Sequence, residues 1–181
     1  MKTTFLVLIF ACLSLFTLAQ TPGFSDTQII NGFTKKISGE DFSYHSSVPP
    51  AKECLLVRAT DGNSSLEWET AVAPVKPEND FVTFVWLAGI GSSPGRARFD
   101  LQVNGKDKFS FWADGSNNWE LKNDDGSSLS FQKDMIDQHG DRFGFMYLKI
   151  PSAKVEKGKP AKIKVTGGKF DKTSPHPKCL I

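Results

Sequence analysis

Two tryptophans and the polar loop between them are the residues of this chain best suited to bind a ligand. A tryptophan ring stacks on the apolar C–H face of a sugar, while carboxylate and amide groups bind its hydroxyls. The candidate ligand-binding residues are Trp112, Asp114, Asn117, Asn118 and Trp119. Their spacing predicts a shallow carbohydrate site at the end of a hairpin. The alternative interpretation is that both rings cover the edge of the core.

Two glutamates raise the question of catalysis. Glu67 and Glu69 alternate with Leu66 and Trp68, so both project from one face of a strand, with about 7 Å between their Cα atoms. Their side chains would span the ~5 Å that separates the carboxyl groups of a retaining glycosidase. Catalytic carboxylates normally come from different elements, however, and a solvent-facing strand commonly carries two glutamates. We therefore expect no catalytic residues here.

Histidines and oxygen ligands form no recognisable site. His45, His139 and His176 are far apart, and none lies near a serine or cysteine in a nucleophile motif. No cysteine and histidine spacing suits zinc. Several turn residues carry side-chain oxygens that would suit calcium, but none follows an ordered calcium loop: Asp61, Asn63, Asp114, Asn123, Asp124 and Asp125. We expect no metal and no cofactor, with a structural calcium ion as the alternative.

Strands must position these side chains. Residues 81–88 are apolar at nearly every position and rich in aromatic and β-branched residues, which is typical of a strand buried on both faces. Residues 143–150 have the same character and are the natural partner. About ten short segments of alternating hydrophobicity, separated by Gly, Asn, Asp and Pro, predict an all-β antiparallel sandwich of jelly-roll type.

The hairpin before Trp112 is predicted from its apolar residues. A two-residue turn at Asn104 and Gly105 would set Phe109 opposite Asp100, on the wrong face of the sheet. A three-residue loop that begins at Val103, with Gly105 as a left-handed bulge, pairs Phe99 with Phe109 and Ala97 with Phe111. We therefore expect the three-residue loop.

The chain divides into four expected parts. Residues 1–19 contain one charge, an apolar run and small residues before Gln20, which predicts a cleaved signal peptide and export to the periplasm or the medium. Residues 20–36 are expected to be a leader with an edge strand, residues 37–168 the sandwich domain, and residues 169–181 an irregular tail. Residues 134–141 are expected to form a helical turn or a polar loop.

Cysteine and charge content set further limits. Cys54 and Cys179 remain after cleavage of the signal peptide, and whether they form a disulfide is left open, because Cys54 lies in an apolar run typical of a small buried residue. The formal net charge is only +2, so nothing favours nucleic acid or an anionic membrane as a partner.

Five segments, in this order, resemble one family. They are SLEWET at residues 65–70, FVWLAG at 84–89, ARFDLQVNG at 97–105, and YLKIP at 147–151 followed by KGKP at 157–160. The arrangement resembles the galactose-binding-like jelly-roll modules attached to large exported bacterial glycoside hydrolases, including α-mannosidase-type enzymes. Chains of that family are several times longer and hold their catalytic domain elsewhere. From this resemblance we expect the chain to be a fragment, a shortened gene product or a free-standing module.

The resemblance implies a non-catalytic exported module that binds carbohydrate or packs against a glycoside hydrolase. One alternative is a structural or protein-interaction domain of an exported protein. A less favoured alternative is a sandwich-fold enzyme that degrades polysaccharides, for which Arg58, Arg98 and Tyr147 are the strand-borne candidates.

Overall fold

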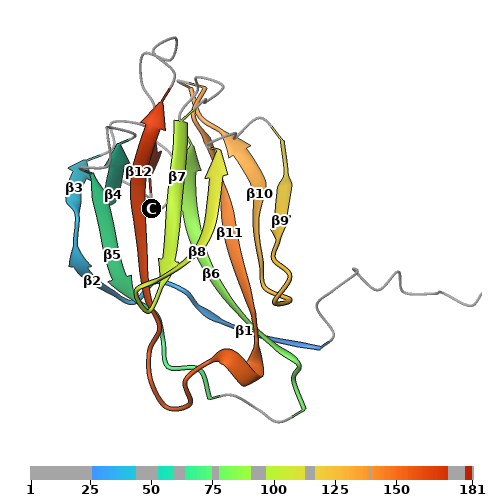
Figure 1. Cartoon of the computed structure of the whole chain (residues 1–181). Helices are drawn as coiled ribbons and strands as arrows, with labels where there is room; N and C mark the ends of the chain where they lie inside the picture. The colour runs from blue at the N-terminus through green and yellow to red at the C-terminus, as the bar shows by residue number, and fades with distance from the viewer. Residues whose placement is uncertain are drawn as a thin grey trace, which may run out of the picture.

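The chain folds into two β-sheets that pack face to face, as Figure 1 shows. The structure is a computed structural model, and it describes residues 26–43, 53–58, 64–74, 78–90, 97–112, 117–138, 140–170 and 178–180. These residues contain thirteen strands and one short 3-10 helix, η1 (Ser152–Lys154). The predicted all-β antiparallel sandwich is confirmed. Within the described residues, no helix is long and apolar enough to cross a membrane.

The larger sheet has eight strands in the order β3-β4-β13-β6-β11-β10-β9, with β1 paired to β6. Their bounds are β1 (Thr27–Asn31), β3 (Glu40–Ser43), β4 (Glu53–Arg58), β6 (Phe81–Ile90), β9 (Trp119–Lys122), β10 (Ser128–Ile136), β11 (Arg142–Pro151) and β13 (Lys178–Leu180). The smaller sheet has five strands in the order β2-β5-β12-β7-β8. Their bounds are β2 (Lys35–Ser38), β5 (Ser65–Glu69), β7 (Ala97–Val103), β8 (Lys106–Trp112) and β12 (Lys162–Phe170).

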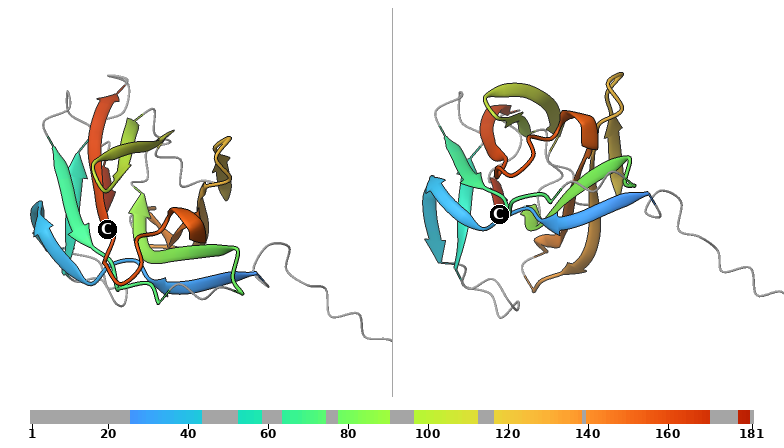
Figure 2. Two further views of the ribbon diagram at one scale, coloured as in Figure 1. Left: turned by 60° about the horizontal axis from the view of Figure 1, so that its bottom comes forward. Right: turned by 90° about the horizontal axis from the view of Figure 1, so that it is seen from below.

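β6 is the central strand of the larger sheet. β11 pairs with it antiparallel along its whole length. On its other side, β1 pairs parallel to residues 81–85 and β13 pairs antiparallel to residues 89–90; Figure 2 shows β1 beside the first half of β6. A strand with partners on both sides and side chains covered on both faces is expected to be apolar at nearly every position. The predicted buried strand at 81–88 and its predicted partner at 143–150 are both confirmed.

The core lies between the inner faces of the two sheets. In β5, Leu66 and Trp68 are fully buried, whereas the intervening glutamates face outward. The Trp68 ring lies 5.4 Å from the Trp86 ring between centroids, edge to face. The Trp68 indole N–H donates a hydrogen bond of 2.6 Å to the Gly32 carbonyl. The polar edge of this ring is therefore satisfied inside the core, as burial requires.

The register predicted for the β7–β8 hairpin is wrong. Phe99 lies opposite Phe111, not Phe109. The turn contains two residues, Asn104 and Gly105, with φ values of 51° and 75°. Two successive positive φ values define the turn whose twist matches that of paired strands, and Asn followed by Gly is the pair that adopts them at least cost.

A β-bulge in β8 explains why the prediction failed. Leu101 pairs with Phe109, but Gln102 pairs with Asp107, so Lys108 is one extra residue in β8. The extra residue shifts the alternation by one position and returns Phe109 to the core face. The prediction assumed an unbroken ladder, in which a two-residue turn would have put Phe109 on the outer face.

Segments expected to be irregular contain strands. β10 continues to Ile136, so the helical turn or polar loop expected from residue 134 is wrong for its first residues. The irregular tail expected over 169–181 is wrong for residues 169–170, where β12 extends to Phe170, and for residues 178–180, which form β13; residues 171–177 and 181 lie outside the described part of the chain. β13 is too short to be stable alone and is held by pairing with β4 and β6. No local pattern encodes such pairing.

The N-terminal boundaries differ less from expectation. The strand expected in the leader is β1, which joins the larger sheet. β2 was not predicted as a separate strand and crosses the expected boundary between residues 36 and 37. The predicted signal peptide, residues 1–19, lies outside the described residues.

The register of β13 also bears on the cysteines. Cys179 lies opposite Val57. Cys54 is three residues away along β4, which places the two Cα atoms about 10 Å apart along the strand. A disulfide requires Cα atoms within about 7 Å, so this register excludes a bond between them. The Cys54 thiol instead donates a hydrogen bond of 3.5 Å to the Phe42 carbonyl.

Candidate functional site

The two tryptophans of the predicted sugar site face different environments. Trp112 is 56% exposed at the end of β8. Trp119, the first residue of β9, is packed against the core, and its ring stacks between Phe111 and Phe131 at centroid distances of 5.6 and 6.2 Å. Successive residues of a strand point to opposite faces, so Phe111 faces inward and Trp112 outward. The two indoles therefore offer no shared surface on which a sugar could stack. The packing of Trp119 matches the alternative interpretation, in which the ring covers the edge of the core.

The polar members of the predicted site lie between these strands. Asp114 is outside the described residues. Asn117 and Asn118 are exposed. The side-chain oxygen of Asn118 accepts a 2.8 Å hydrogen bond from the backbone N–H of Lys133 in β10. That bond ties the start of β9 to β10, so one polar group of the predicted site is already engaged within the protein.

Trp112 has polar neighbours that the sequence prediction missed. Arg98 lies directly opposite Trp112 in the β7–β8 ladder, and Asp100 lies opposite Ser110. The guanidinium of Arg98 donates a 2.9 Å hydrogen bond to Ser110 Oγ, and its Nε is 3.6 Å from the Asp100 carboxylate. The Ser110 hydroxyl in turn donates to Asp100. We call these four residues, on the outer face of the smaller sheet, the Trp112 cluster.

A groove runs beside the Trp112 cluster. Its volume is about 470 Å³, within the usual range for small-ligand sites. Its lining is mainly polar: Arg98, Asp100, Gln102, Asp107, Lys108, Phe109, Ser110 and Thr166. The Gln102 amide donates a 2.7 Å hydrogen bond to Asp107. The groove therefore combines charged, amide and hydroxyl groups next to one exposed aromatic ring.

Alternation within β7 and β8 was the signal that could have identified this cluster. Arg98 and Asp100 alternate with buried residues, as do Ser110 and Trp112. The three-residue loop expected at the turn would have placed Ser110, instead of Trp112, opposite Arg98. An error of two residues in register separated the aromatic ring from its polar neighbours.

The glutamates of β5 are matched by lysines. In the ladder with β12, Glu67 lies opposite Lys164 and Glu69 lies opposite Lys162. Lys35 of β2 is also 4.0 Å from the Glu69 carboxylate. Opposite charges facing each other across strands are a common way to stabilise a solvent-facing sheet. The pattern fits a structural role for both glutamates.

Among the acidic side chains that the structure describes, Asp125 has the most strongly altered environment. It accepts hydrogen bonds from Lys108 and from the backbone N–H of Ser127, the latter 2.9 Å long, and Lys154 Nζ lies 3.3 Å from its carboxylate. The hydrogen bond from Lys108 holds the pKa of Asp125 well below its usual range, against the opposing effect of burial. Two ammonium groups already balance this carboxylate, which makes it a poor calcium ligand.

The remaining calcium candidates are only partly described. The side-chain amide of Asn123 donates a 2.7 Å hydrogen bond to the Lys108 carbonyl, and Asp124 is exposed. Asp61 and Asn63 lie outside the described residues. Among the residues that are described, no group of three or more His, Cys, Asp and Glu side chains is placed to hold a metal ion.

The candidates for an enzymatic alternative do not meet. Arg98 lies on the outer face of the smaller sheet, whereas Arg58 and Tyr147 belong to the larger sheet. Arg58 forms a hydrogen-bonded ion pair with Glu40, 2.9 Å between Nη2 and Oε1, and this bond lowers the pKa of Glu40. The three histidines lie outside the described residues.

Comparison with known proteins adds no relative: no protein-family model, curated protein or solved structure matches the chain. The class of protein is therefore defined by the fold alone, an all-β sandwich with an exposed aromatic and polar cluster on the smaller sheet.

Proposed function

We propose that the chain is a non-catalytic, exported binding module that takes carbohydrate on the outer face of its smaller sheet. The observation that carries this proposal is the exposure of Trp112 beside hydrogen-bonding groups. A tryptophan that is 56% exposed leaves a large apolar ring face in water. Folding of the sandwich does not require an exposed tryptophan at this position. Stacking against a sugar would remove the ring face from water.

The groups beside Trp112 suit sugar hydroxyls. Arg98 offers N–H donors, Asp100 offers acceptors, and Ser110 offers both. They already hold one another through hydrogen bonds, so a ligand would meet side chains whose positions are set before binding, which lowers the entropy cost of association. Gln102 and Thr166 extend the same face along the groove.

The proposed context is an accessory module of an exported glycoside hydrolase. Its support is the ordered set of segments that resembles galactose-binding-like modules, together with the predicted signal peptide at residues 1–19. In this setting the smaller sheet would bind the polysaccharide while a separate domain cleaves it. A structural calcium ion stays an alternative within the same proposal.

A glycan array tests the proposal. The chain from Gln20 to Ile181 is applied with and without calcium, beside the variants Trp112→Ala and Ile136→Ala. Ile136 is 51% exposed on the larger sheet and is the matched control for loss of an exposed apolar side chain. Glycan binding that is lost in Trp112→Ala and kept in Ile136→Ala supports the proposal. Absence of binding by the unchanged chain, or equal binding by both variants, overturns it.

A protein-interaction domain is the second candidate function. Exposed tryptophan and arginine are the residues that most often anchor protein–protein interfaces, and Trp112 faces Arg98 across the ladder. This candidate becomes the favoured one if no glycan binds and Trp112→Ala abolishes association with a purified glycoside hydrolase domain.

A further inference from the structure

The groove beside the Trp112 cluster follows one strand, β7. Arg98, Asp100 and Gln102 are alternate residues of β7, so their side chains line the groove from one face of the sheet. β8 and β12 flank β7; side chains of β8 line one side of the groove, and Thr166 of β12 lines the other. The groove therefore runs along the strand, with about 13 Å between Arg98 and Gln102 at the usual strand rise. We call it the β7 groove.

Each end of the β7 groove offers contacts to a sugar. At one end, Trp112 lies opposite Arg98 and exposes its ring. At the other end, Gln102 lies opposite Asp107, and the Gln102 amide donates a 2.7 Å hydrogen bond to one oxygen of the Asp107 carboxylate. The second carboxylate oxygen and the Gln102 amide oxygen are left to accept hydrogen bonds from hydroxyl groups. The distance between the two ends is too long for one sugar ring and suits a short run of linked rings.

The charged side chains described along the β7 groove balance one another. Arg98 and Lys108 are its cations, and Asp100 and Asp107 are its carboxylates. Arg98 Nε lies 3.6 Å from the Asp100 carboxylate, and the Lys108 ammonium is bonded to Asp125. A sugar that carried a carboxylate or a sulfate would have to compete with these pairs, and Asp100 and Asp107 would repel it. The groove therefore favours an uncharged chain.

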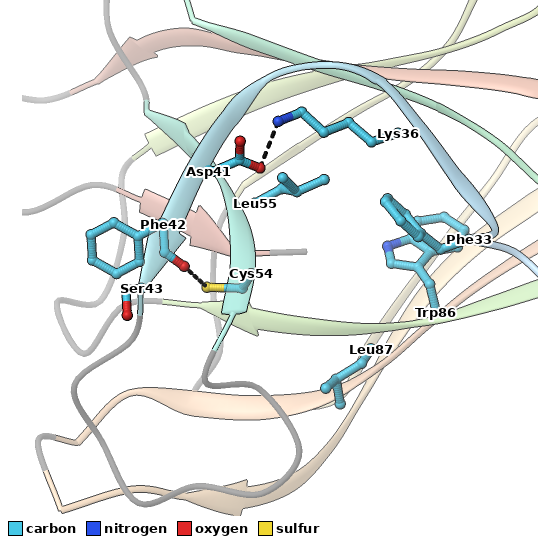
Figure 3. Close-up of a pocket in the computed structure, with 9 residues that line it drawn as sticks. All are labelled: Phe33, Lys36, Asp41, Phe42, Ser43, Cys54, Leu55, Trp86 and Leu87. Carbon is cyan, nitrogen blue, oxygen red and sulfur yellow. Dashed lines mark hydrogen bonds and ion pairs between the residues drawn. The ribbon is translucent and has the colours of Figure 1, made fainter.

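The hollow in Figure 3 is a less suitable place for a sugar chain. It has a volume of about 760 Å³ and is lined by side chains of β3, β4 and β6, among others. Its charged side chains, Lys36 and Asp41, already pair at 2.5 Å. The rest of its lining is mostly apolar: Phe33, Phe42, Ser43, Cys54, Leu55, Trp86 and Leu87. Every sugar unit carries hydroxyl groups, and apolar walls leave them without hydrogen-bond partners at a cost in free energy.

We propose that the β7 groove binds a run of about two or three units of an uncharged, extended polysaccharide, laid along the strand. This inference rests on the carbohydrate-binding function proposed above and specifies its substrate. One unit stacks on Trp112, the next lies over Asp100 and its ladder partner Thr166, and the last reaches the pair of Gln102 and Asp107. Only a chain contacts all three places; a single terminal sugar contacts one.

The test is isothermal titration calorimetry on the chain from Gln20 to Ile181. The probes are linear galactan, mannan and glucan oligosaccharides, from the monosaccharide upward, each beside a counterpart whose primary hydroxyl groups are oxidised to carboxylates. We expect the affinity to rise up to the trisaccharide in at least one neutral series and then to level off, because further units pass beyond Gln102 and Asp107. The oxidised counterparts are expected to bind about tenfold more weakly.

Three variants locate the bound chain. Gln102→Ala is expected to weaken trisaccharide binding about tenfold and monosaccharide binding far less, since only the longer probe reaches this residue. Glu67→Ala is the matched control and is expected to leave binding unchanged, because Glu67 lies in the same row of the sheet but two strands from Gln102, across Lys164. Asp100→Asn removes one carboxylate from the groove and is expected to reduce the preference for neutral probes over oxidised ones.

The outcomes separate this inference from the proposal on which it rests. Full affinity already at the monosaccharide, oxidised probes that bind as tightly as neutral ones, or unchanged trisaccharide binding in Gln102→Ala overturns the inference. In each of these cases, glycan binding that is lost in Trp112→Ala still supports a carbohydrate-binding module. Absence of binding in every series overturns both proposals.

Discussion

The contrast between Trp112 and Trp119 gives the sharpest prediction. Trp119 lies between Phe111 and Phe131 and is mostly buried. Burying roughly 100–150 Å² of indole at about 25 cal/mol per Å² stabilises the fold by about 3 kcal/mol. Two aromatic contacts add about 0.5–1.5 kcal/mol each. Trp119→Ala is therefore expected to lower the free energy of unfolding by about 4–6 kcal/mol, whereas Trp112→Ala is expected to change it by less than about 0.5 kcal/mol.

Urea unfolding, followed by circular dichroism so that the removed indole does not alter the signal baseline, measures both values. Phe131→Leu is a useful comparison, because it keeps an apolar residue in the core and removes the ring contact with Trp119. The reasoning is refuted if Trp112→Ala costs more than Trp119→Ala. A small effect at both positions would equally contradict it, since Trp119 would then contribute nothing as a core-edge residue.

Three further predictions follow from single positions. Gly144→Ala is expected to destabilise the fold by several kcal/mol, because a Cβ there would lie 2.1 Å from the Gln132 carbonyl oxygen; thermal melting that is unchanged would contradict this packing. Gly105→Ala is expected to cost about 1 kcal/mol through its φ of 75° alone, since a Cβ there meets open space, and chemical denaturation measures this cost. Asp125→Asn is expected to cost about 1 kcal/mol near pH 7 by removing the ion pair with Lys108. The folded-state pKa of Asp125 is lowered, so its stabilisation is present above the unfolded pKa of about 3.9 and is lost as the pH falls below it; a cost that stays constant down to about pH 2 would contradict this sign.

Much of the fold was predictable, because the hydrophobicity of its most apolar segments indicates directly that they are buried strands. A run such as 81–88, apolar at nearly every position, fits only a central strand, and residues 143–150 are its equal in hydrophobicity. Alternation in β5 likewise determined which face of Leu66 and Trp68 enters the core. These patterns extend over only a few residues, so the position of each strand and its buried face follow from the local sequence.

The candidate sites were less predictable, because they depend on register and on partners distant in the chain. The Lys108 bulge moved Trp112 opposite Arg98, and a bulge leaves no clear signal in composition. β13 lies between β4 and β6 and pairs with both, although it is distant from each of them in the chain. The local pattern of residues 178–180 does not indicate such an arrangement.

The sequence by itself determined the class of structure, an all-β sandwich, and the alternation of apolar residues determined the inner faces of its sheets. At Asn104 and Gly105 it also supplied two residues that adopt positive φ values readily. Only the tertiary structure decided which side chains meet outside the core. It turned Trp119 inward and Trp112 outward. The physical reason is that burial of apolar side chains is a local, additive property, whereas the pairing of strands is a choice among registers of similar burial that differ by one or two residues.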